Sequence, residues 1–240
     1  MSHEIYYEDL DIIEYGKAWD LQEAYMKQGL DIKSGQHNQL IPNETPIPHR
    51  LLICQHPHVY TLGKSGAETH LLINNQRMKD LGVTFYKTNR GGDITYHGPG
   101  QMVAYPILDL EQFFTDLGKY MRFLEESIML TLADFGIISG RLEGSTGVWL
   151  DADQPGKARK ICAMGVRCSR WITIHGLALN INSDLSFFNH IVPCGIVDKG
   201  VTSMEKELGH KIDENEVKGI FLKHFAAVFA ASIVPATVPV

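Results

Sequence analysis

The sequence lacks the segments that carry a chain into or across a membrane. Its start, MSHEIYYEDLDIIEYGK, has no basic region followed by an apolar one, so it predicts neither a signal peptide nor a transit peptide. No apolar run approaches the roughly 18 residues that a transmembrane helix needs. We therefore expect a cytoplasmic protein that does not act on a membrane.

Cysteine and positive charge are also scarce. The four cysteines, Cys54, Cys162, Cys168 and Cys194, are too sparse in 240 residues for a disulfide framework, so free thiols are expected. Lysine and arginine number 22 against 28 acidic residues, for a net charge of -6. This balance argues against a nucleic-acid binder, and an acidic partner would need a local basic patch.

Several motifs of known chemistry are absent. No Gly-Lys-Ser/Thr ends a glycine-rich loop, and no G-x-G-x-x-G spacing occurs, which excludes the standard nucleotide loops. Neither C-x-x-C nor H-E-x-x-H is present, so zinc would need ligands assembled from distant segments. We expect no metal.

The chain contains predicted strands and helices but no internal repeat. Strands are predicted over residues 4–10, 50–56, 83–87, 102–110, 147–150, 159–168 and 171–181. Helices are predicted over residues 15–29, 113–135 and 217–233, with a short one at the capping box Thr202–Glu205. The pattern indicates an α/β (α+β) class: a mixed sheet flanked by helices. We expect one domain over residues 1–240, with residues 31–49 a surface insertion and the Pro- and Asn-rich part from Lys33 to His49 a loop.

The stretch RGGDITYHGPGQ, from Arg90 to Gln101, is the first candidate site. It lies between two predicted strands, and its glycines would let backbone N–H groups face a ligand. A plain glycine-rich turn is the alternative, although a turn does not need Arg90, Thr95 and His97.

The second candidate is ARKICAMGVRCSRWITIHGLALNI, from Ala158 to Ile181. Its alternation places Lys160 opposite Ile161, Ala163 and Gly165, and taken alone it fits a solvent-facing strand residue. The small residues indicate that something packs close to the backbone.

The third candidate is Cys194, between Pro193 and Gly195 in a loop-like segment. A cysteine in that setting is more exposed than one inside an apolar strand such as Cys54, and can be a nucleophile. A papain-like set of Cys194, His175 and Asn180 is conceivable, but no local pattern supports it.

Together these motifs resemble one family, the octanoyltransferases of lipoate biosynthesis. The matching pieces are QHPHVYTLGKSG, RGGDITYHGPGQMVAYPILDL, GVW, ARKICAMGVRCSRWITIHGLALNI and IVPCGIVDKGVTSM, in the family's order over most of residues 50–210. The resemblance implies the fold of lipoate and biotin ligases. It implies transfer of an octanoyl group from acyl carrier protein to a lysine of apo lipoyl domains. The acceptors would be the E2 subunits of 2-oxoacid dehydrogenases and the glycine-cleavage H protein, with no cofactor.

The resemblance also implies roles for particular residues. The acyl-carrying cysteine falls on Cys194 and its lysine partner on Lys160. The substrate-binding segments fall on Arg90, Gly91, Gly92, Asp93, Ile94, Thr95, Tyr96 and His97, on Ala163, Met164 and Gly165, and on Gly176, Leu177 and Ala178.

The chemistry is consistent with this assignment. A thiol is both nucleophile and leaving group, so it can take an acyl group from one thioester and pass it to an amine without ATP. A free thiol has a pKa of about 8.5, and a lysine ammonium nearby would favour the thiolate. We expect Lys160 to do this, and the small residues of the segments to leave room for an acyl slot. Acidic partners would dock at Lys157, Arg159, Arg167 and Arg170.

Two other functions remain open at this point. An ATP-dependent lipoate or biotin ligase of the same fold also uses a glycine-rich loop and a lysine, but has no use for Cys194. A non-catalytic acyl-binding module would not need both Cys194 and Lys160.

Overall fold

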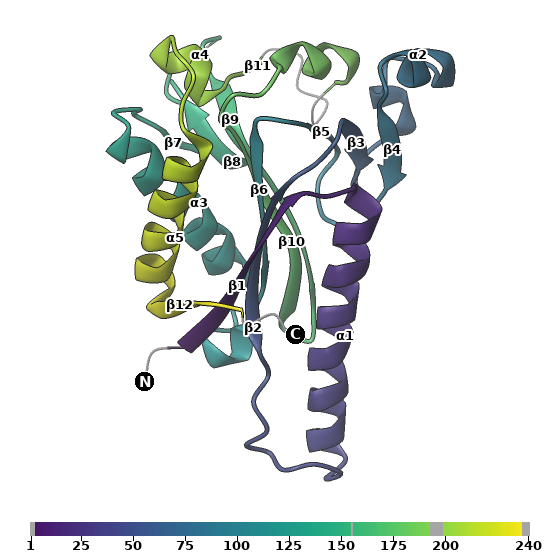
Figure 1. Cartoon of the computed structure of the whole chain (residues 1–240), viewed down its shortest axis with the longest axis vertical. Coiled ribbons are helices and arrows are strands. Elements are labelled where there is room, and N and C mark those ends of the chain that lie inside the picture. Colours follow the sequence, from purple (N-terminus) through teal and green to yellow (C-terminus); the bar gives the residue numbers. More distant parts are fainter. Residues whose placement is uncertain (1–2, 155, 193–198, 237–240) are drawn as a thin grey trace.

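The computed structural model describes residues 3–154, 156–192 and 199–236. No helix within these ranges combines the length and apolar character needed to cross a membrane. The strands form a mixed sheet, and helices cover both of its faces, which confirms the predicted fold class (Figure 1).

The large sheet has nine strands among the described residues, in the order β12-β1-β2-β6-β10-β9-β8-β7, with β11 paired to β9. The strands β12, β1 and β2 are parallel, and the pairs from β2 to β7 are antiparallel. Their bounds are β1 (His3–Ile12), β2 (His49–Gln55), β6 (Gln101–Ile107), β7 (Gly140–Leu142), β8 (Ser145–Leu150), β9 (Arg159–Ser169), β10 (Ile172–Asn180), β11 (Gly200–Val201) and β12 (Ala231–Pro235).

A second, smaller sheet has the order β4-β3-β5 and lies beside the N-terminal end of α1 (Figure 1). Its strands are β3 (Val59–Leu62), β4 (Thr84–Lys87) and β5 (Ile94–His97). The helices are α1 (Tyr15–His37), α2 (Asn75–Asp80), α3 (Leu117–Asp134), α4 (Met204–Leu208) and α5 (Glu214–Phe229), with the 3-10 turns η1 (Glu68–His70), η2 (Leu110–Gln112) and η3 (Leu185–His190).

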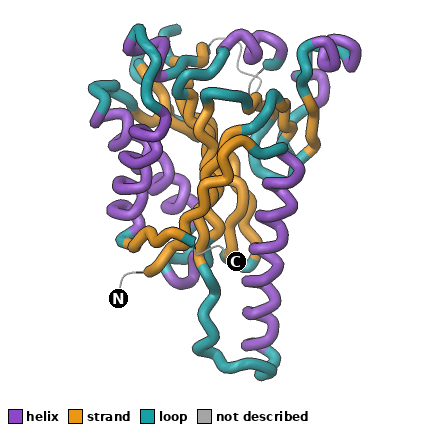
Figure 2. The backbone as a smooth tube through the Cα atoms, viewed as in Figure 1, coloured by secondary structure: helices purple, strands orange, loops and turns teal. Residues whose placement is uncertain are grey.

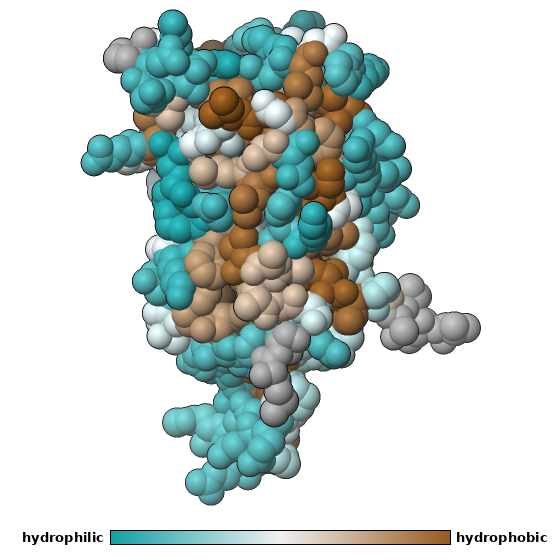
Figure 3. All heavy atoms as spheres, turned by 90° about the vertical axis from the view of Figure 1, so that its left-hand side faces the viewer, coloured by the Kyte–Doolittle hydropathy of each residue, from teal (hydrophilic) through white to brown (hydrophobic). Residues whose placement is uncertain are grey.

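Helices α3 and α5 cover one face of the large sheet, and α1 covers the other (Figures 1 and 2). In α3 the fully buried Tyr120, Leu124, Ile128 and Leu132 recur every four residues, which produces one apolar stripe. Asp116 caps the helix by accepting a hydrogen bond from the Lys119 N–H. The predicted helix over 113–135 is therefore confirmed, although it begins four residues later. Figure 3 shows the face on the side of α3 and α5, where apolar side chains form a band between hydrophilic ones.

The helix α1 is longer than the sequence pattern predicts, and the expected loop from Lys33 to His49 is wrong for its first five residues. The side chain of Lys33 donates hydrogen bonds to Asp109 Oδ1 (2.6 Å) and to the Arg170 carbonyl (2.8 Å). Gln36 donates to the backbone of the loop that follows. These tertiary contacts stabilise a last turn whose composition alone favours a loop.

Two further predictions, the end of the C-terminal helix and the conformation of the glycine stretch, are corrected because each segment contains a strand. The predicted helix over 217–233 ends at Phe229, because Ala230 takes a left-handed conformation (φ 50°). The chain then forms β12 at the edge of the sheet, where Ile233 pairs with Ile5 of β1. The glycine stretch from Arg90 to Gln101 contains the strand β5, which pairs with β3. That stretch is thus a short loop followed by a strand.

Candidate active site

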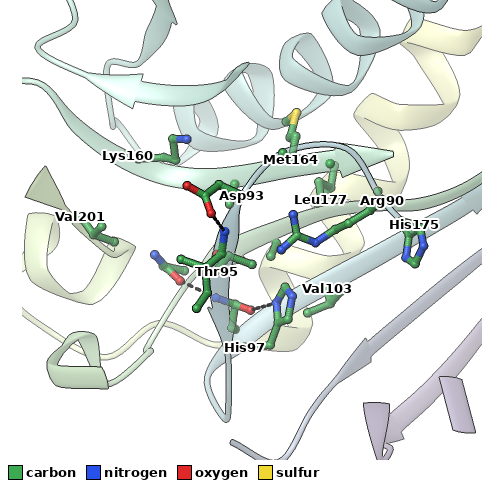
Figure 4. Close-up of a pocket in the computed structure, with 18 of the residues that line it drawn as sticks. Arg90, Asp93, Thr95, His97, Val103, Lys160, Met164, His175, Leu177 and Val201 are labelled. Atoms are coloured by element: carbon green, nitrogen blue, oxygen red, sulfur yellow. Dashed lines mark hydrogen bonds between the residues drawn. The ribbon is translucent and has the colours of Figure 1, made fainter. Parts of the chain in front are cut away.

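A cavity lies where β5 and the loop before it meet strands β6, β9 and β10, and its empty volume, mouth included, is about 780 Å³ (Figure 4). Most lining residues come from these four segments. They are Arg90, Gly92, Asp93, Ile94, Thr95, His97, Gln101, Val103, Tyr105, Lys160, Ala163, Met164, Gly165, His175, Gly176, Leu177, Ala178 and Asn180, with Tyr15 from α1, Phe188 from η3 and Val201 from β11.

The structure brings most of the sequence-predicted site residues to this one cavity. Lys160 and all three predicted segments contribute to its walls. Two predicted residues, Gly91 and Tyr96, are not among the lining residues. Cys194 lies outside the described residues.

Tyr96 and Gly91 have internal contacts instead. The Tyr96 ring is fully buried in the core of the small sheet and stacks on Phe187, with ring centroids 4.9 Å apart. The alternation of side chains along β5 explains this, since Thr95 and Tyr96 point to opposite faces. The N–H of Gly91 donates to the Val166 carbonyl over 2.9 Å, which joins the loop to β9.

Two glycines of the cavity, Gly165 and Gly176, also permit close packing of the chain against itself, while the acyl slot that they were expected to form stays a prediction. A Cβ on Gly165 would lie 2.7 Å from the Gly91 carbonyl oxygen. One on Gly176 would lie 2.1 Å from the Ala104 carbonyl oxygen. Both glycines therefore permit close backbone approach within the protein.

A β-bulge directs Lys160 into the cavity. Val148 pairs with Cys162 and Trp149 with Lys160, so β9 has one residue more than β8 at this point, Ile161. Ile161 and Cys162 are consecutive, yet both are buried in the same core cluster. The extra residue reverses the alternation beyond it, and Lys160 lines the same cavity as Ala163. The solvent-facing interpretation of Lys160, drawn from uninterrupted alternation, is therefore wrong.

A chain of buried hydrogen bonds joins two walls of the cavity. The Gln101 side chain donates to Asn180 Oδ1 (2.8 Å), and Asn180 Nδ2 donates to the Thr202 carbonyl (3.0 Å). Because Gln101 donates through its nitrogen, its oxygen accepts from His97 Nδ1 (2.8 Å), and His97 presents Nε2 as an acceptor. Burial, together with the nearby imidazole of His56, lowers the pKa of His97 to about 3, so the ring is neutral.

His175 and Arg90 close another side of the cavity. His175 is buried with a left-handed backbone (φ 58°), and its Nε2 lies 2.7 Å from Asn89 Oδ1. Burial and the Arg90 guanidinium lower the pKa of His175 to about 3. Arg90 donates to the carbonyl and hydroxyl of Thr61, which anchors the loop on β3. The side-chain partners of His175 and Asn180 are Asn89, Gln101 and Thr202, so these two side chains do not pair with each other as in a papain-like set, whose Cys194 lies outside the described residues.

Sequence reasoning gave no site role to the lining residues Tyr15, Val103, Tyr105, Phe188 and Val201. It named Gln101 only as the end of the glycine stretch, and His175 and Asn180 only in the papain-like set. Val103 and Tyr105 belong to a strand recognised only as buried, and Tyr15 only as the start of a helix. No local pattern marks them, because a cavity wall and a core strand have the same apolar signature.

Two other expectations concern a metal site and a basic patch. Among the described residues no group of three or more His, Cys, Asp or Glu side chains is arranged to hold a metal ion. Two of the four residues of the predicted basic patch are paired with carboxylates: Arg159 with Asp151 and Glu207, and Arg167 with Glu23.

The fold and this cavity define the class of catalytic domain to which the chain is similar. The family model of the lipoyl protein ligase A/B catalytic domain matches residues 14–226. The bi-partite lipoate protein ligase of Thermoplasma acidophilum has the same fold, with a TM-score of 0.69 over 99% of this chain and 88% of that chain. At 13% identity, that likeness concerns the fold alone.

Closer relatives narrow the class. An octanoyltransferase of Flavobacterium johnsoniae is 54% identical over 98% of this chain and 100% of its own length. One of Cytophaga hutchinsonii is 53% identical over 94% of this chain and 93% of its own length. The chain belongs to this octanoyltransferase family, and it is an acyltransferase.

Proposed function

We propose that this protein takes an octanoyl group from octanoyl-acyl carrier protein onto Cys194 and passes it to a lysine of an apo lipoyl domain. The acceptors are E2 subunits of 2-oxoacid dehydrogenases and the glycine-cleavage H protein, and the reaction takes place in the cytoplasm. The observation that carries the proposal is the position of Lys160, a cation turned by a bulge into a largely apolar cavity.

The other cysteines support Cys194 as the nucleophile. Burial raises the pKa of Cys54, Cys162 and Cys168, which disfavours their thiolates. None of the three lines the cavity. In contrast, the segment that contains Cys194 continues into Val201, which lines the cavity and pairs with Lys160.

Lys160 has two tasks in the proposed mechanism. In the first half-reaction the Cys194 thiolate attacks the donor thioester, the bond to the carrier sulfur breaks, and the leaving carrier thiolate takes a proton from the Lys160 ammonium. In the second, the neutral acceptor amine attacks the octanoyl-Cys194 thioester. The amide forms, the Cys194 thiolate leaves, and the proton lost by the amine returns to Lys160.

The acyl chain fits the apolar part of the cavity. Ile94, Val103 and Ala178 contribute apolar surface to its walls. At about 0.8 kcal/mol for each buried CH₂, seven carbons contribute about 5 kcal/mol before the cost of ordering the chain. Remote binding energy of this size favours octanoyl over short acyl groups.

The test is to incubate the protein with octanoyl-acyl carrier protein without ATP and to measure its intact mass. We expect one octanoyl group on the wild type and none on Cys194→Ser, while the matched control Cys168→Ser is acylated normally. Adding an apo lipoyl domain should then discharge the adduct. A strict requirement for ATP would indicate a ligase instead. If octanoate binds in the cavity but Cys194 is never acylated, the protein is a binding module.

A further inference from the structure

Lys160 lies against an aromatic ring. Its Nζ atom is 4.6 Å from the centroid of the Trp149 ring. The two residues are cross-strand partners on β8 and β9, next to the bulge at Ile161. Trp149 is 2% exposed, so the ring faces the ammonium with little competing water. This is the geometry of a cation–π contact.

The backbone around the pair is built to leave space for the lysine stem. Gly147 has φ 110°, a conformation that L residues rarely adopt. A Cβ there would lie 2.5 Å from the Cys162 carbonyl oxygen and 3.5 Å from Cε of Lys160. The N–H of Gly147 donates to Glu125 Oε1 over 3.1 Å. The buried Glu125 therefore fixes the glycine on which the stem lies.

The indole N–H of Trp149 is energetically unfavourable at this position. Trp149 Nε1 is buried and has no hydrogen-bond partner in the part of the chain that the structure describes. A buried N–H without a partner loses its hydration, a penalty that a phenyl ring would avoid. An indole face attracts a cation more strongly than a phenyl face does. The sequence thus carries the ring that binds an ammonium best, at a site where the indole N–H has no partner among the described residues.

We propose that Trp149 is a positioning residue, whose π face holds the Lys160 ammonium in line with the cavity for both proton transfers. This inference rests on the proposed function of Lys160. Without the ring, the ammonium is less stabilised and its flexible stem samples other directions. The thiolate of Cys194 then loses part of its counter-charge.

The first measurement tests the contact without relying on catalysis. In ¹³C-lysine-labelled protein, the side-chain signals of Lys160, assigned by their loss in Lys160→Arg, should be shifted upfield by the ring current of Trp149. The shift should disappear in Trp149→Leu and persist in part in Trp149→Phe. Trp171→Phe, in the turn between β9 and β10, is the matched control and should leave these signals unchanged. Unshifted wild-type signals would overturn the inference.

The second measurement is the rate of Cys194 alkylation against pH. We expect Trp149→Leu to lower the rate at neutral pH at least about threefold and to move the midpoint to higher pH, with Trp149→Phe in between. Trp149→Phe should unfold at a denaturant concentration close to that of the wild type, because removing the unpaired N–H offsets part of the buried surface that is lost. A stable Trp149→Phe with reduced reactivity separates positioning from packing.

The alkylation profile distinguishes failure of the Trp149 role from failure of the Lys160 role. If Lys160→Met changes the profile of alkylation rate against pH and neither Trp149 variant does, the positioning role of Trp149 alone is wrong. If Lys160→Met also leaves the profile unchanged, the proposed role of Lys160 and the positioning role of Trp149 are both wrong, even where the ring-current shift is present.

Discussion

Gln101 on β6 donates a hydrogen bond to Asn180 on β10 over 2.8 Å, and this pair connects His97 to the backbone of Thr202. The Thr202 N–H in turn donates to the Lys160 carbonyl over 2.9 Å. A continuous hydrogen-bonded path thus runs from the neutral imidazole to the strand that carries the lysine.

Breaking this path should affect both stability and rate. Asn180→Ala removes the partner of the Thr202 carbonyl and leaves the Gln101 amide with the Tyr96 carbonyl alone (3.2 Å), so we expect a loss of about 1–3 kcal/mol in the free energy of unfolding. Octanoyl transfer should slow as well, because the segment that follows β11 loses its anchor on β10. Chemical denaturation and a transfer assay measure the two effects. Asn75→Ala, on the exposed surface of α2, is the control, and equal behaviour of the two variants would contradict the prediction.

Ala178 should limit the acyl chain that the cavity accepts. Ala178→Leu places three more carbons in the wall, which displaces about three methylene groups of the substrate and costs about 2 kcal/mol of binding. We expect kcat/KM for an octanoyl donor to fall about 30-fold, and that for a butanoyl donor to fall much less. The control is Ala133→Leu on the exposed side of α3. A uniform loss with both donors would show that the wall does not measure chain length.

Gly147 should tolerate a side chain less well than another glycine with positive φ does. Gly147→Ala meets the Cys162 carbonyl in addition to its strained backbone, whereas Gly144→Ala (φ 72°) has open space around its Cβ. Both variants should be destabilised, Gly144→Ala by about 1 kcal/mol and Gly147→Ala by more. Urea unfolding compares them. Equal destabilisation would mean that the contact with Cys162 relaxes without cost.

The neutral histidines predict how stability depends on pH. The folded-state pKa values of His97 and His175 are about 3, below the ordinary value of 6.5. Below pH 6.5 these two histidines are protonated in the unfolded chain but stay neutral in the folded chain. The stability from these rings is therefore fully present above pH 6.5 and is lost as the pH falls towards 3. For each ring the loss approaches about 1.4 kcal/mol per pH unit.

Unfolding free energies measured between pH 7 and pH 4 test this slope. His97→Gln should reduce it, because one titrating ring is gone. His210→Gln should not, because that ring is exposed. A slope unchanged by His97→Gln would contradict the assignment of a neutral, buried imidazole.

The local patterns of the sequence predicted most elements correctly. The stripe of apolar residues in α3 depends on contacts within a few turns, and such contacts are encoded locally. The capping box at Thr202–Glu205 correctly predicted the short helix α4, but Ser203 caps it instead of Thr202. The last turn of α1 and the strand β12 could not be predicted in this way. The first depends on Lys33 reaching Asp109, and the second on an edge of the sheet left open by β1.

The same division holds for the site. The motifs, in their order, identified the family of the chain, and through that resemblance they pointed to three segments and to Lys160 as parts of the site. Taken without the resemblance, Lys160 fits a solvent-facing strand residue. Only the tertiary structure decided the direction of Lys160, the inward role of Gly165 and Gly176, and the withdrawal of Tyr96 into the small sheet. A one-residue bulge reverses the face of every residue beyond it, and the neighbouring strand that sets the bulge lies outside any local pattern.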